Sequence, residues 1–126
     1  MAQLGYGAAR ERSDNEYKLS DHTIKVGVTI DQAARDDDNT PTTTLRKGLV
    51  LGKVTASGKY KEYDDNASDG TETAAGILDE EINLLDETGT AADSQTTMII
   101  HGYVDESELV GIDANGKSDL AQIIFG

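Results

Sequence analysis

The chain has 126 residues, a net charge of −13 and no cysteine. This length fits one domain with a modest core, and the lack of cysteine excludes disulfides, zinc–thiolate sites and thiol catalysis. Residues 1–47 are nearly neutral, whereas residues 48–126 are strongly acidic and would repel nucleic-acid phosphates. No apolar run of about 18 residues could span a membrane, and the first twelve residues lack the apolar core of a secretory signal. We therefore expect neither a direct nucleic-acid partner nor a membrane partner.

The first 21 residues are polar and of mixed charge. Their few large apolar side chains follow no helical period: Leu4, Tyr6, Tyr17 and Leu19. A segment of this composition buries too little apolar surface to fold alone. It predicts an extended N-terminal arm that can bind a partner.

Residues 22–31 show the clearest alternation of apolar and polar side chains in the chain. Every second residue from position 24 to position 30 is apolar: Ile24, Val26, Val28 and Ile30. A period of two predicts a strand. Polar segments flank this strand on both sides, so two alternatives stay open. It can join the sheet of another chain as part of the arm, or it can belong to the sheet of its own body.

Residues 31–47 predict a linker. The run Asp36-Asp37-Asp38 predicts a solvated, charged turn, and Pro41 disfavours a helix before it. We place a boundary near residue 47. Residues 1–47 are then the arm and linker, with one amphipathic strand, and residues 48–126 are a compact β-rich body.

The body predicts a series of short strands. Runs rich in β-branched and other apolar residues occupy positions 48–54, 73–78 and 96–103, and the tyrosines at positions 60 and 63 favour a short strand over residues 59–63. The acidic stretch 79–93 favours a strand near Ile82, although a helical turn also fits, and residues 104–110 suit a short helix or an edge strand. The pair Asn115-Gly116 predicts a turn. The apolar end, residues 120–125, predicts a C-terminus docked in the core.

Patterns for catalysis or metal binding are weak. His22 and His101 lie in separate segments, and neither has a partner at the spacing of a metal ligand. An EF-hand alignment of residues 65–76 fails, because Ala67 and Gly76 occupy ligand positions. Motifs for a nucleophile elbow or a phosphate-binding loop are not found in the sequence. We therefore expect no enzymatic activity, no cofactor and no metal site.

A series of short motifs follows in order along the body: Gly48–Val54, Gly58-Lys59-Tyr60, Asp69-Gly70, Ala75-Gly76-Ile77-Leu78 and Thr96–Ile100 leading into Gly102-Tyr103. In order and spacing this series, over residues 45–126, resembles the head decoration proteins of lambda-type tailed phages. The resemblance implies a mainly β, β-clip-like fold with little helix. It also implies a homotrimer at threefold sites of a capsid and an N-terminal arm that orders on the major capsid protein.

The resemblance therefore implies a structural protein of the virion, made in the host cytoplasm, that decorates and stabilises the outer capsid surface. The residues expected to contact the major capsid protein are those of the arm: Leu4, Tyr6, Tyr17, Leu19, Ile24, Val26, Val28 and Ile30. The alternative is an extracellular calcium- or carbohydrate-binding β module of an adhesin-like protein. The acidic loops 64–72 and 79–87 suggest that alternative.

Overall fold

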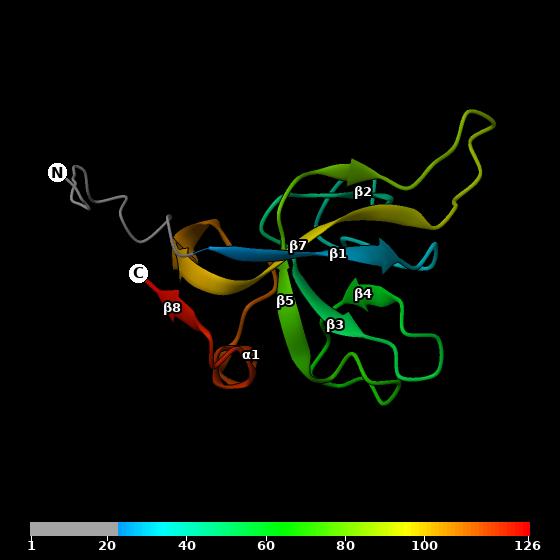
Figure 1. Cartoon of the computed structure of the whole chain (residues 1–126). Coiled ribbons are helices and arrows are strands. Elements are labelled where there is room, and N and C mark those ends of the chain that lie inside the picture. The colour runs from blue at the N-terminus through cyan, green and yellow to red at the C-terminus, as the bar shows by residue number, and fades with distance from the viewer. Residues whose placement is uncertain (1–22) are drawn as a thin grey trace, which may run out of the picture.

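A computed structural model describes residues 23–126 of the chain. The fold is mainly β with little helix, as the sequence predicts (Figure 1). Its strands are β1 (Ile24–Ile30), β2 (Thr44–Leu45), β3 (Val50–Lys53), β4 (Tyr60–Glu62), β5 (Ala74–Leu78), β6 (Ile82–Asn83), β7 (Ser94–Val104) and β8 (Ile123–Phe125). Its helical elements are the 3-10 turn η2 (Glu106–Glu108) and the short helix α1 (Ala114–Asp119).

The main sheet closes into a small barrel. Strands β4, β3, β5 and β7 follow one another in the sheet, and β1 closes the ring by pairing with β7 and β4. β1 runs antiparallel to β7 along its whole length, from the pair Ile24–His101 to the pair Ile30–Ser94. Its contact with β4 is a single parallel bridge between Ile30 and Tyr60. β8 pairs in parallel with the last residues of β7, and β2 and β6 form a separate two-stranded sheet.

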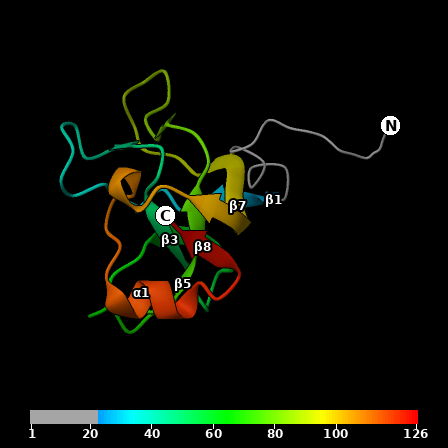
Figure 2. The ribbon, with the colours of Figure 1, turned by 90° about the vertical axis from the view of Figure 1, so that its left-hand side faces the viewer.

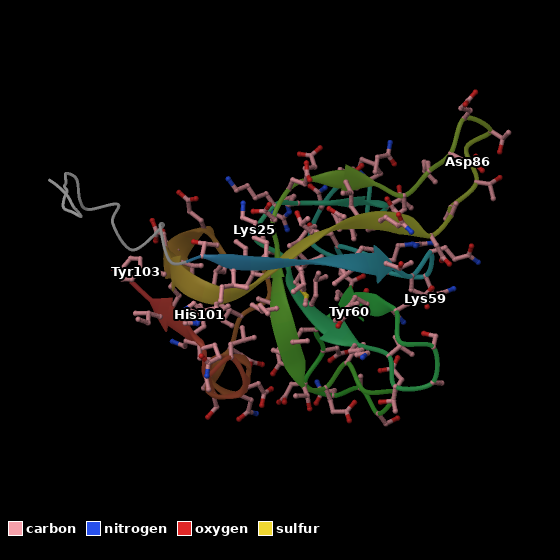
Figure 3. The ribbon with its side chains drawn as sticks, in the orientation of Figure 1. Lys25, Lys59, Tyr60, Asp86, His101 and Tyr103 are labelled. Atoms are coloured by element: carbon pink, nitrogen blue, oxygen red, sulfur yellow. The ribbon has the colours of Figure 1, made fainter. Side chains whose placement is uncertain are left out.

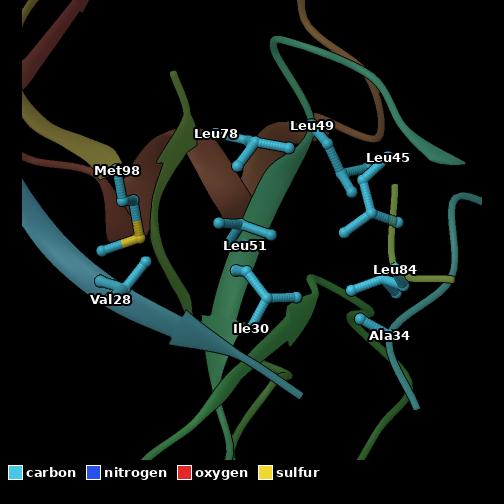
Figure 4. Packing of buried hydrophobic residues seen from close by; sticks show 9 residues of the cluster. All are labelled: Val28, Ile30, Ala34, Leu45, Leu49, Leu51, Leu78, Leu84 and Met98. Carbon is cyan, nitrogen blue, oxygen red and sulfur yellow. The ribbon is translucent and has the colours of Figure 1, made fainter. Parts of the chain in front are cut away.

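The barrel wall is buried on both faces where β3 and β5 lie side by side. In β3, Leu51 packs in the cluster inside the barrel, while its neighbour Val50 belongs to a second cluster. In β5, Leu78 packs in the first cluster and its neighbour Ile77 belongs to the second. Figure 4 shows the first cluster, which consists of Val28, Ile30, Ala34, Leu45, Leu49, Leu51, Leu78, Leu84 and Met98. The second cluster includes Leu120 and Ile123, from the end of α1 and from β8, which lie together on one side of the barrel (Figure 2).

Two glycines allow close approach of neighbouring atoms at the barrel wall. A Cβ atom on Gly52 in β3 would lie 2.6 Å from the Cα of Thr71. A Cβ atom on Gly76 in β5 would lie 2.5 Å from Cγ of Met98. Both separations are shorter than a van der Waals contact, so only glycine fits at these positions without a shift of the neighbour.

Residues 23–47 share a core with the rest of the described chain. Val28, Ile30, Ala34 and Leu45 pack in the same cluster as residues that follow position 47. The strand predicted at residues 22–31 is confirmed as β1, and of the two alternatives for its partner the structure has the sheet of its own body. Core side chains therefore come from both sides of residue 47, and the division of the chain at that residue stays a prediction.

The expectation of a solvated run at residues 36–38 is wrong for Asp36. Its side chain is buried, whereas Asp37 and Asp38 are exposed. The Asp36 carboxylate accepts hydrogen bonds from the backbone N, Nε and Nη2 of Arg46, at 3.1, 2.8 and 2.9 Å. This bidentate pair lowers the pKa of Asp36, chiefly through the side-chain hydrogen bonds from Arg46. The pair joins the two ends of the loop formed by residues 36–46.

The prediction of a turn at Asn115-Gly116 is wrong, because both residues lie in the helix α1. Asp113 precedes the helix in an extended conformation, and its carboxylate accepts a hydrogen bond from the Gly116 N–H at 2.7 Å. This N-cap satisfies a helix donor that would otherwise be free. The Asp113 carboxylate also accepts a hydrogen bond from Tyr63 Oη at 2.8 Å, which fastens the helix to the segment after β4.

Candidate binding surface

The structure separates the residues that the sequence assigned to the capsid-binding arm. Leu4, Tyr6, Tyr17 and Leu19 lie outside the described residues. Along β1 the side chains pass from exposed to buried. Ile24 is 51% exposed and Val26 is partly buried, whereas Val28 and Ile30 are 8% and 0% exposed. Val28 and Ile30 are core residues, so in this structure their side chains cannot reach a partner.

Three of the four exposed large hydrophobic side chains of residues 23–126 lie at one end of the molecule. Ile24, Tyr103 and Ile124 are 51%, 42% and 59% exposed. Ile24 pairs with His101 on β7, two residues before Tyr103, and Tyr103 pairs with Ile124 on β8. Figure 3 shows Tyr103 and His101 side by side at this end. We call the surface formed by Ile24, Tyr103 and Ile124 the apolar end.

The three backbone segments of the apolar end carry no carboxylate, lysine or arginine. They are residues 23–24, 101–103 and 122–125. The nearest charged groups along the chain already have partners. Lys25 lies 3.2 Å from Asp79, and Asp105 accepts hydrogen bonds from the Ser107 side chain and N–H, which lower its pKa. Within residues 23–126 the outer edge of β8 has no partner strand. The apolar end therefore combines apolar side chains with free main-chain groups.

A shallow hollow of about 280 Å³ adjoins the apolar end. Tyr103 is one of its lining residues, together with the apolar side chains of Ile77, Ile99 and Leu109. Lys47, Asp105 and Glu108 add charged groups to the lining. The hollow lies between Tyr103 on β7 and the η2 turn.

The opposite end of the molecule is different in character. Between β6 and β7 the chain projects from the barrel as a hairpin (Figure 1), closed by a bridge between Leu85 and Ala91. Asp86 organises its tip by accepting hydrogen bonds from the N–H groups of Thr88 and Thr90 and from Thr88 Oγ1. The side-chain bond from Thr88 is the main reason that the pKa of Asp86 lies below its ordinary value. This hairpin resolves the path of the acidic stretch that the sequence left open.

The carboxylates and the phenol with perturbed pKa values have structural partners. Burial raises the pKa of Glu62, whose carboxylate accepts a hydrogen bond from the Arg35 N–H at 2.8 Å. Burial also raises the pKa of Tyr63, which donates to Asp113. Within residues 23–126 no three side chains are grouped in a way that could hold a metal ion. In the same part of the chain, neither helical element has the length and apolar character needed to cross a bilayer.

Tyr103 and Ile124 were not among the residues that the sequence assigned to a binding surface. The sequence placed Tyr103 in a strand and Ile124 in a docked C-terminus. Ile123 is indeed buried, at 5% exposure, but its neighbour Ile124 points outward because side chains alternate along β8. Ile123 and Ile124 are consecutive apolar residues in an edge strand. Because neighbouring side chains in a strand point to opposite sides, this pair could have indicated that one of the two is exposed.

The fold defines a class: small, mainly β proteins with a barrel-like sheet. The family model for bacteriophage lambda head decoration protein D matches residues 16–123 of the chain. The chain therefore belongs to that family of phage head decoration proteins, and the resemblance drawn from the sequence is confirmed. The family is one of structural proteins associated with the phage capsid. A comparison with curated proteins gave no match.

Proposed function

We propose that the protein is a homotrimeric cement protein that binds the major capsid protein at threefold sites on the outer surface of a tailed-phage capsid. The observation that carries this proposal is the match of residues 16–123 to the head decoration family. Its work is mechanical: it staples neighbouring capsid subunits, so that the shell resists the pressure of packed DNA. This role requires neither a reaction nor a cofactor. The protein is made in the host cytoplasm and acts on the virion.

The binding element in this proposal is the arm, now limited to residues 1–22. Residues 24–30 form β1 and close the barrel, so they are not available as a separate arm strand. Residues 1–22 hold the apolar side chains Leu4, Tyr6, Tyr17 and Leu19 in a polar context. A segment of this composition can bind by adding a strand to the edge of a partner's sheet, where main-chain hydrogen bonds provide affinity and alternate side chains provide specificity.

Trimerisation strengthens this mode of binding. Ordering an arm at binding costs free energy, and this cost weakens the contact of a single arm. In a trimer the second and third arms bind at a high effective concentration, because the first has already placed the body on the shell. The weak contact of one arm then becomes stable attachment of three.

The test is removal of residues 1–22, followed by a binding assay with capsids that lack a decoration protein. The structure sets the site of truncation, because removal of residues 1–30 would also remove Val28 and Ile30 from the core. We expect residues 23–126 to melt at the same temperature as the full chain. Co-sedimentation with capsids should show an affinity lower by about 100-fold or more, since the avidity of three arms is lost. A truncated protein that binds as tightly as the full chain would refute the arm mechanism.

Sedimentation equilibrium tests the trimer separately. One copy of the chain has a mass of 13.4 kDa. The proposal expects three copies in each unit that binds at a threefold site of the capsid. Counting the copies bound to each capsid at saturation tests the trimer on the shell itself. Binding of single copies at sites away from threefold positions would contradict the trimer.

A further inference from the structure

We infer that Asn115 is a site of spontaneous deamidation, that the attachment of α1 to the barrel controls the rate of this modification, and that the product weakens the attachment. The reaction needs only the Asn115-Gly116 sequence and water, so it is separate from capsid binding. It replaces the side-chain amide of Asn115 with a carboxylate. Asn115 lies on the exposed surface of α1, where water reaches it.

An asparagine followed by glycine deamidates because the backbone attacks the side chain. The Gly116 N–H gives up its proton to solvent, and the nitrogen attacks Cγ of Asn115. The bond from Cγ to Nδ2 breaks, Nδ2 takes up a proton and leaves as ammonia, and a five-membered succinimide ring forms. Water then opens the ring at either carbonyl carbon and leaves aspartate or isoaspartate. Glycine favours the attack because it has no Cβ to crowd the ring.

Packing requires the glycine that makes Asn115 reactive. Gly116 is buried, and a Cβ atom there would lie 3.2 Å from both Cδ1 of Ile112 and Cε2 of Tyr63. These separations are tighter than an ordinary van der Waals contact, so a larger residue needs one of these neighbours to shift. The labile pair is therefore a consequence of how closely α1 packs on the barrel.

Three hydrogen bonds hold Asn115 and Gly116 away from ring closure. The Gly116 N–H donates to Asp113 Oδ1 at 2.7 Å, so a nitrogen that lost its proton would face a carboxylate. Nδ2 of Asn115 donates to Asp65 at 2.9 Å, which holds the side-chain amide in place. The Tyr63 hydroxyl donates to the same oxygen of Asp113 at 2.8 Å and keeps it in position. Because ring closure also requires Asn115 to leave the helical backbone conformation, the reaction proceeds from molecules in which α1 has opened.

The rate in the folded protein therefore follows the fraction of molecules in which α1 is open. The cap from Asp113 and the hydrogen bond from Tyr63 together make this open state about 30-fold rarer, equivalent to about 2 kcal/mol. Deamidation should be slower in the folded protein than in the unfolded chain by the same factor.

The product disturbs the helix in two ways. The new carboxylate at position 115 faces Asp65, and two carboxylates at this position repel each other, where the amide now donates a hydrogen bond. In the isoaspartate product the backbone also gains one carbon, which displaces Gly116. The Gly116 carbonyl accepts the N–H of Leu120, a buried residue of the second cluster. Deamidation therefore loosens the packing of α1 on the barrel.

The rate test follows position 115 by peptide mapping and mass spectrometry, in full-length protein held at mildly alkaline pH below its melting temperature. Tyr63→Phe removes one hydrogen bond to Asp113 and should speed deamidation about fivefold, equivalent to about 1 kcal/mol. Tyr60→Phe is the matched control: it removes the same hydroxyl group from β4 and should leave the rate unchanged. The full-length protein unfolded in urea should react about 30-fold faster than the folded protein.

Three outcomes of the rate test would overturn the inference. The first is an unmodified Asn115 in the unfolded chain. The second is an equal rate in the folded and the unfolded protein. The third is an equal rate in Tyr63→Phe and Tyr60→Phe, which would show that the attachment of α1 does not control the reaction.

The stability of the product is measured on deamidated protein, which anion exchange separates by its additional negative charge. This protein should melt about 5 °C below the unmodified protein. Asn115→Asp, which supplies the charge without the altered backbone, should also melt lower. Asn83→Asp is the control, because it adds the same charge at an exposed residue and keeps the oxygen that accepts the Leu85 N–H. Deamidated protein that melts with the unmodified protein would overturn the proposed effect on α1.

Discussion

The buried pair of Asp36 and Arg46 gives a quantitative prediction about stability. The Asp36 side chain is fully buried, whereas the Arg46 side chain is 39% exposed. Asp36→Asn keeps the shape of the side chain but removes the charge, and it leaves one acceptor oxygen where three donors of Arg46 now bind. Two of the three donors bind Oδ2, so an amide oxygen placed there keeps two hydrogen bonds and loses the one from Nη2 to Oδ1. The lost bond contributes about 1.5 kcal/mol, and each of the two kept bonds loses about half of that with the charge of its acceptor. The free energy of unfolding should therefore fall by about 3 kcal/mol.

The assay is urea unfolding at neutral pH, with Asp37→Asn as the matched control. Asp37 is exposed and adjacent, so the same chemical change there should alter the unfolding free energy by less than about 0.5 kcal/mol. In thermal unfolding, a loss of 3 kcal/mol corresponds to about 12 °C for a domain of this size. Equal stability of the Asp36 and Asp37 variants would show that the ion pair between Asp36 and Arg46 does not stabilise the fold.

The pH dependence of the Asp36 effect has a defined sign. The pKa of Asp36 is lower in the folded protein than in the unfolded chain, because Arg46 stabilises the carboxylate. The stabilisation is therefore complete above the ordinary carboxyl pKa and is lost as the pH falls through the lower folded value. The difference in unfolding free energy between the unchanged protein and Asp36→Asn should be constant at neutral pH and should shrink in acid.

Three further predictions concern the barrel and its helix. Leu51→Ala should lower the unfolding free energy by about 3 kcal/mol, because Leu51 is completely buried; a loss below 1 kcal/mol in urea unfolding would contradict the packing. Gly52→Ala should lower the melting temperature because its Cβ would meet the Thr71 backbone, whereas Gly27→Ala, with open space around its Cβ, should leave it unchanged or raise it; equal melting of the two variants would count against this difference. Tyr63→Phe removes the hydrogen bond to Asp113 and should lower the unfolding free energy by about 1 kcal/mol, and an unaltered urea midpoint would show that this bond does not stabilise α1.

The strands of the body could be predicted because their signals are local. Runs of apolar and β-branched residues around Val50, Ile77 and Ile99 produce strands wherever they pack. The closing partner of β1 could not be chosen, because an alternating strand has the same pattern in its own sheet and in a neighbour's. That choice depends on β7, which is distant in the sequence.

Burial of polar groups was the other limit. The sequence around Asp36 contains three consecutive aspartates, and nothing local distinguishes the one that meets Arg46 ten positions later. The helix α1 was missed for a similar reason, since Asn115-Gly116 is a strong turn signal. The cap from Asp113 and the contact with Tyr63 are both needed to override it. Ile124 was not predicted to be exposed, because the sequence does not show which residue of β8 faces outward.

The closure of the barrel by β1 also sets the order in which the chain can fold during synthesis. β1 is made before every other strand of residues 23–126, yet its main partner is β7, and the neighbouring contact of Gln32 with Asp93 spans 61 positions. Contacts this distant in sequence form slowly, because a long loop must close first. An amphipathic strand therefore leaves the ribosome well before its partner exists. Val28 and Ile30 have no β7 partner until residues 94–96 have emerged, and the acidic sequence between them helps to keep the nascent chain in solution.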